Sequence, residues 1–149
     1  MLPSHMRNRT LAELEGHDIP EPKEHSYLID TIYRLRRVPL HEFTAEDLRI
    51  MIGQSISLQY LVPLAIERLQ RHSLTHGDYF PGDLLAATLR ADHKFWRDNP
   101  QCRKQLHEIA ERTISSLRGR SHKKKEDFRI TLEVLTEAYD IFAAATSAV

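Results

Sequence analysis

The chain has 149 residues, 41% hydrophobic and 28% charged, which is the composition of a single soluble globular domain. Lysine plus arginine and aspartate plus glutamate number 21 each, and the resulting zero net charge argues against a dedicated nucleic-acid-binding protein. The one cysteine, Cys102, excludes an internal disulfide and a cysteine-based zinc site, and no apolar run approaches the roughly 20 residues that span a bilayer.

The N-terminal segment predicts a tail followed by one short helix. Residues 1–9 are polar and lack the apolar segment of a signal peptide, so we expect a flexible tail there and one helical domain over residues 10–149. Thr10 and Glu13 are spaced as a capping box, and Gly16 ends the turn that they begin.

A second helix is predicted after a proline-containing loop. Ser26 can cap it, and it extends to about Arg37 before Pro39 stops it. Three apolar residues at helical spacing are expected to line one face: Leu28, Ile32 and Leu35.

The longest apolar-rich stretch has its centre at residues 47–69 and predicts a central helical hairpin. Thr44 and Asp47 form a near capping box at its start. Gly53 closes the first helix or permits a close crossing, and Pro63 either starts the second helix or kinks it. The apolar positions recur at helical spacing: Leu48, Met51, Ile52, Leu58, Leu61, Val62, Ala65, Ile66 and Leu69.

The sequence GDYFPG, residues 77–82, predicts a structured turn with Tyr79 and Phe80 at its centre. We interpret Phe80 as a plug that closes the core, whereas Tyr79 is either a second plug or a binding epitope. Asp83 then starts a short helix, and a further short turn carries Phe95 and Trp96.

Two longer helices complete the chain. Asn99 followed by Pro100 is a strong helix start, and Gly119 ends that helix. Its apolar face comprises Leu106, Ile109, Thr113 and Leu117. The last helix, over about residues 125–145, places Phe128, Leu132, Leu135, Tyr139 and Phe142 on one face. We therefore predict an all-α fold, a compact single-domain bundle of about five to seven helices around the central hairpin.

No pattern in the sequence predicts catalytic, cofactor-binding or metal-binding residues. His72 and His76 are four residues apart, but the residues between them suggest that the helix has ended, and no HExxH motif exists. Cys102 lies in a first helical turn beside Arg103 and Lys104, where a thiol pKa can fall, but no base can be named for it. Five glycines leave little material for a phosphate-binding loop.

Two groups of residues are candidates for a surface that binds a protein partner. Glu133, Glu137 and Asp140 fall on one face of the last helix, and such a stripe either recognises a basic partner or is an ordinary solvated face. Asp78 and Tyr79 on the predicted turn are the second choice.

Two basic stretches support an alternative function, a small helical nucleic-acid-binding or regulatory module. They are Arg34 with Arg36 and Arg37, and residues 123–125. Aromatic residues are not interleaved with either stretch, so the pattern of single-strand binding is missing and solvated surfaces explain them better.

Several blocks of the sequence, in this order and spacing, resemble a bacterial family. The blocks are TLAELEG at residues 10–16, FTAEDLRIMIGQSISLQYLVPLAIERL at 43–69, GDYFPGDLLAATLR at 77–90, and Phe95-Trp96. Together they are similar to the immunity proteins of contact-dependent growth inhibition (CDI). The helices after Asn99 match only in general character.

This resemblance implies a small cytoplasmic protein without catalytic activity or cofactor. Its partner would be the C-terminal toxin domain of a CdiA-type effector that a neighbouring cell delivers, and many such toxins are nucleases. Neither a membrane nor a direct nucleic-acid contact is implied. The shared motifs read as capping, turn and core residues, so they do not identify the toxin-contacting side chains.

Overall fold

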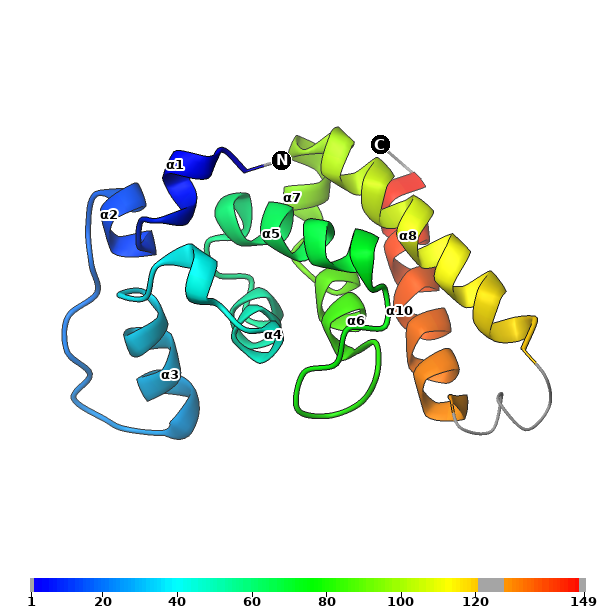
Figure 1. Ribbon diagram of the computed structural model, residues 1–149, viewed down its shortest axis with the longest axis horizontal. Helices are drawn as coiled ribbons and strands as arrows, with labels where there is room; N and C mark the ends of the chain where they lie inside the picture. The colour runs from blue at the N-terminus through cyan, green and yellow to red at the C-terminus, as the bar shows by residue number, and fades with distance from the viewer. Residues whose placement is uncertain (1, 121–127, 148–149) are drawn as a thin grey trace.

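The computed structural model describes residues 2–120 and 128–147, and this part of the chain is helical without a strand (Figure 1). The predicted all-α class is confirmed. Nine α-helices occur in the described residues, slightly more than expected, because Ser4–Arg7 and His93–Asp98 also form short helices. In chain order the elements are α1 (Ser4–Arg7), α2 (Leu11–Glu15), α3 (Tyr27–Leu35), the 3-10 helix η1 (Leu40–Glu42), α4 (Ala45–Gly53), α5 (Leu58–Arg71), α6 (Asp83–Leu89), α7 (His93–Asp98), α8 (Pro100–Arg118) and α10 (Arg129–Ser147).

Local capping residues start the early helices as predicted. The side chains of Thr10, Ser26 and Thr44 each accept a hydrogen bond from the backbone N–H three residues later. At Thr44 the capping box is complete, because the Asp47 carboxylate also accepts the Thr44 N–H at 2.9 Å. Gly16 ends α2 with a left-handed φ of 74°, a conformation that glycine adopts without strain.

Residues 2–9, which we expect to be a flexible tail, include a short helix. Helix α1 forms within them, and Leu2 is buried in the core. The Arg7 guanidinium lies 2.6 Å from the Glu67 carboxylate of α5. Both contacts reach residues distant in the sequence, which explains why a local reading of this polar segment missed its order.

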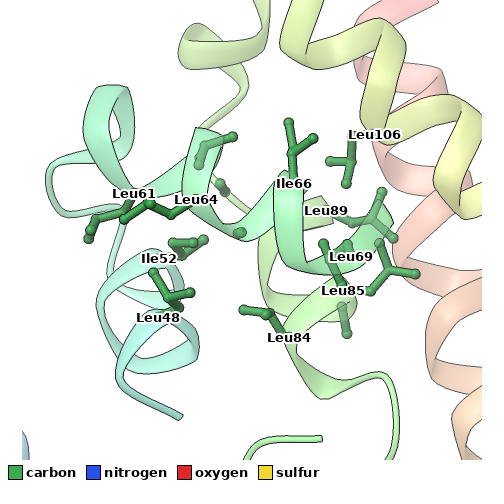
Figure 2. Close-up of a cluster of buried hydrophobic side chains, with 14 of the residues drawn as sticks. Leu48, Ile52, Leu61, Leu64, Ile66, Leu69, Leu84, Leu85, Leu89 and Leu106 are labelled. Atoms are coloured by element: carbon green, nitrogen blue, oxygen red, sulfur yellow. The ribbon is translucent and has the colours of Figure 1, made fainter. Parts of the chain in front are cut away.

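The central hairpin of α4 and α5 is confirmed as the core of the fold. Figure 2 shows leucine and isoleucine side chains of α4, α5, α6 and α8 meeting in one cluster. Pro63 lies inside α5, whose first residue is Leu58, so it does not start the helix. A Cβ at Gly53 would meet no atom within 4 Å, so this glycine does not serve a close crossing.

Helix α3 buries the predicted face only in part. Leu35 is buried and Ile32 packs against the core, but the buried partner on the preceding turn is Thr31, and Leu28 is exposed. The first turn of α3 therefore presents apolar side chains to solvent.

Helix α8 packs against α5 of the hairpin, and α10 packs against α6, α7 and α8. The predicted face of α8 is buried along its length. Asn99 precedes α8, but its side chain donates to the Phe95 carbonyl (2.9 Å) and does not cap the helix. Trp96 of α7 is buried and meets Phe142 of α10 edge to face, with ring centroids 5.5 Å apart. None of the described helices is long and apolar enough to cross a membrane.

Candidate partner-binding surface

A groove of about 400 Å³ lies between the start of α3, helix α4 and the turn at residues 77–80. We call it the aromatic groove, because two tyrosines from different segments line it. Its principal lining residues are Tyr27, Leu28, Glu46, Arg49, Asp78 and Tyr79.

The tyrosines of this groove are unusually exposed. Tyr27 is 74% and Tyr79 is 71% accessible to solvent, and Leu28 beside them is 38% accessible. Tyrosine combines a large apolar ring with a polar tip and loses little conformational entropy on binding, so it is enriched among the residues that anchor protein interfaces. The groove thus presents side chains suited to contact another protein.

Asp83 fixes the turn that carries Tyr79. Its side chain, in a residue only 3% accessible, accepts hydrogen bonds from the backbone N–H groups of Gly77 (2.6 Å), Tyr79 (3.0 Å) and Phe80 (3.4 Å). Because Asp83 is the first residue of α6, whose leucines lie in the core, the turn is tied directly to the rigid part of the fold.

Gly77 packs closely against two side chains within the same turn. A Cβ at this position would lie 2.8 Å from a carboxylate oxygen of Glu46 and 2.9 Å from one of Asp83. The same Glu46 oxygen accepts the backbone N–H of Asp78 at 3.2 Å. Two carboxylates on different helices therefore hold the turn from both sides.

The charged side chains of the aromatic groove interact with one another. Arg49 forms an ion pair with Glu46, and its guanidinium carbon lies 4.4 Å from the centroid of the Tyr79 ring. The hydrogen bond from Arg49 lowers the pKa of Glu46, whereas interaction with the Glu46 carboxylate raises the pKa of Asp78. Two carboxylates against one guanidinium leave the groove with a local negative charge at neutral pH.

Sequence reasoning placed Asp78 and Tyr79 at a possible epitope, and the structure brings both into the aromatic groove. It did not find Tyr27, Glu46 or Arg49, which come from distant segments. One signal was present in the sequence: Tyr27 begins a run of three apolar residues, and consecutive helical positions cannot all face one core.

The predicted carboxylate stripe lies elsewhere, on α10. Glu133, Glu137 and Asp140 are exposed and line a shallow groove of about 550 Å³ together with Ile141. Ile141 and Ile130 are the large apolar residues most exposed on this helix. The acidic stripe is thus flanked by apolar side chains, a mixture that suits a protein partner, and its role as an interface stays a prediction.

The basic cluster on α3 is neutralised within the fold. Arg36 is buried, with its guanidinium 2.6 Å from the Glu15 carboxylate and 3.4 Å from that of Asp18. Arg37 lies 2.8 Å from Asp18, and Arg34 lies 3.9 Å from Asp47. These arginines fasten α3 to its surroundings, so they do not form a free cationic surface for phosphates.

The side chains that could serve as a nucleophile, an acid or a base lie in environments typical of structural residues. Burial raises the pKa of the Cys102 thiol, the opposite of an activated nucleophile. The Tyr139 hydroxyl lies 3.1 Å from Nδ1 of His107, and burial together with a hydrogen bond to Glu111 raises the pKa of Tyr139 to about 12. In residues 2–120 and 128–147, no group of three or more potential ligands is arranged to hold a metal ion.

Exposed tyrosines on a rigid support are the kind of side chains that are enriched at protein–protein interfaces. A family model of CDI immunity proteins matches residues 13–106, more than half of the chain, and the chain therefore belongs to this family. The match includes the aromatic groove and extends into α8, beyond the residues that carry the resemblance in sequence. No curated protein and no solved structure matches the chain.

Proposed function

We propose that the protein binds the C-terminal toxin domain of a cognate CDI effector in the cytoplasm and neutralises it, without catalytic turnover of its own. Family membership supports an immunity function. The observation that carries the binding role is the pair of exposed tyrosines, Tyr27 and Tyr79, on a turn and helix held by the core. In this proposal the toxin docks on the aromatic groove.

The two tyrosines act as anchors in this proposal. Their rings lose exposed apolar area when a partner covers the groove, and the rigid turn limits the entropy lost on binding. The carboxylates of Glu46 and Asp78 favour a toxin surface that contributes a lysine or arginine.

The carboxylate stripe of α10 has a separate role in this proposal. A nuclease toxin needs an electropositive active site to hold phosphate, and a neutral immunity protein can complement it only by grouping carboxylates locally. Glu133, Glu137 and Asp140 form such a group. They attract the toxin during encounter, whereas the aromatic groove supplies more of the affinity.

Replacing Tyr79 with alanine tests the proposed function. The dissociation constant for the toxin encoded beside this protein should rise at least about tenfold, because a buried aromatic anchor is lost. Isothermal titration calorimetry measures the affinity, and survival of cells expressing the toxin measures protection. Tyr27→Ala should act in the same direction. Tyr33→Ala is the matched control, since Tyr33 lies on α3 and stacks on Arg37. Unchanged toxin affinity in both Tyr79→Ala and Tyr27→Ala would exclude the aromatic groove as the toxin-binding surface.

Charge reversal on α10 tests the steering role. Changing Glu133, Glu137 and Asp140 to lysine should slow association and weaken protection without unfolding the helix, because complementary charges mainly raise the association rate. Stopped-flow association at two salt concentrations, with circular dichroism as the folding control, measures this. A control with the same change in net charge replaces three exposed carboxylates elsewhere: Glu21, Asp98 and Glu108. If rate and salt dependence are unchanged, the interface lies elsewhere.

The alternative of a nucleic-acid-binding or regulatory module now rests on residues 123–125, which lie outside the described residues. Nucleic-acid binding would weaken steeply with salt, whereas a protein interface with an apolar centre persists at moderate salt. The association measurements therefore also separate these two functions.

A further inference from the structure

A second cavity, of about 190 Å³, lies between α1, η1 and the C-terminal half of α5. Its floor is apolar, since Phe43 and Leu48 are buried there. Its rim is cationic, with the guanidinium groups of Arg7, Arg68 and Arg71 contributed by two different helices. We call it the arginine pocket.

The arginine pocket has more positive than negative charge. Glu67 is the one carboxylate that lines it, and the Arg7 guanidinium already binds both Glu67 oxygens, at 2.6 and 2.7 Å. Within the part of the chain that the structure describes, no carboxylate lies within 4.0 Å of Arg68 or Arg71. Among the described residues these two cations therefore have no direct ion pair, although the Asp47 carboxylate acts on Arg68 from a greater distance.

Arg68 is the informative member of this group. Burial lowers its pKa, so its guanidinium has lost part of its hydration. Its one hydrogen bond to a described residue goes to the Phe43 carbonyl, whereas a guanidinium has five N–H donors. Partial burial of a cation without a direct ion pair is unfavourable, and an anion in the pocket would relieve it more than the distant Asp47 carboxylate does.

We propose that the arginine pocket binds a small oxyanion of the phosphate class, either inorganic phosphate or a phosphate monoester. Arg68 and Arg71 supply charge-assisted hydrogen bonds, and their planar donor groups match the geometry of phosphate oxygens. The small volume excludes a bulky ligand, and the apolar floor strengthens the electrostatic attraction. This site is separate from the aromatic groove and does not depend on the proposed toxin binding.

Inorganic phosphate added to the whole protein should raise its melting temperature saturably. Sodium chloride at equal ionic strength should not, because only an anion that binds the folded state specifically stabilises it by mass action. A small phosphate monoester, glycerol 3-phosphate, titrated in parallel distinguishes free phosphate from a monoester as the ligand. Tighter binding than phosphate indicates a monoester ligand, weaker binding indicates free phosphate, and either result supports the site.

Arg71→Gln should weaken phosphate binding about tenfold, because one charge-assisted hydrogen bond is removed. Arg71 is exposed, so the variant should fold normally. Arg71→Lys keeps the charge but loses the planar donor pair, and its affinity should be intermediate. Arg97→Gln, an exposed arginine on α7, is the matched control and should bind as the unmodified protein does.

Three results would overturn the proposal. Equal stabilisation by phosphate and chloride would show a general salt effect. Equal phosphate affinity of Arg71→Gln and Arg97→Gln would place the anion elsewhere. Displacement of phosphate by duplex DNA with a steep dependence on salt would show that the pocket belongs to an extended nucleic-acid surface.

Discussion

Replacing Leu69 with alanine is expected to lower the free energy of unfolding by about 2–5 kcal/mol. Leu69 is fully buried on α5, in the cluster where α4, α5, α6 and α8 meet (Figure 2). The truncation removes apolar area from the core and leaves a cavity that rigid neighbours cannot fill. Leu61, also fully buried, should respond similarly. Urea unfolding followed by circular dichroism measures both changes.

A leucine outside the core provides the control. Leu28→Ala on the first turn of α3 should change the free energy of unfolding by less than about 1 kcal/mol, because Leu28 is already accessible to solvent. A change below about 1 kcal/mol at both Leu61 and Leu69 would contradict the assignment of the hairpin as the core.

Replacing Asp83 with alanine is expected to destabilise the protein by about 3 kcal/mol, because three backbone N–H groups lose a charged acceptor. The turn at 77–80 should loosen with it, so toxin affinity should fall although Asp83 itself is buried. Asp83→Asn should recover part of both losses, since an amide oxygen still accepts hydrogen bonds. Chemical denaturation and calorimetry measure the two quantities on the same samples.

The matched control for Asp83 is Asp98→Ala. Asp98 is exposed at the end of α7, and its removal should change stability by no more than about 0.5 kcal/mol. Two results would count against the role given to Asp83: stability equal to that of the control variant, or full toxin affinity in a variant that has lost stability.

The features that could be predicted from sequence depend on neighbouring residues. The capping box of Thr44 and Asp47 formed as expected because donor and acceptor are three residues apart. The apolar spacing of the hairpin likewise marked a broad buried face, and the all-α class followed from it.

The features that were missed depend on contacts between distant segments. The order of α1 requires Arg7 to meet Glu67, 60 residues later in the chain. The aromatic groove requires the start of α3, helix α4 and the turn at 77–80 to lie side by side. Spacing within one helix carries no information about such encounters.

The exposed first turn of α3 shows a further limit of prediction from the sequence. Apolar spacing placed Leu28 on the buried face with Leu35, but Thr31 occupies the buried position on that side of the helix. Periodicity identifies a face, whereas the depth of each residue depends on where the neighbouring elements end.

Because Asp83 holds the turn through the main chain of the turn, the side chains of the turn can change in evolution. Its hydrogen bonds go to main-chain N–H groups, so they do not depend on which side chains occupy positions 78 and 79. Within this turn, Gly77 approaches Glu46 and Asp83 closely. Mutation can therefore exchange the residues that we propose for recognition while the scaffold keeps its shape. If the toxin docks here as proposed, a lineage can follow a changing toxin through substitutions at these two positions, without rebuilding its fold.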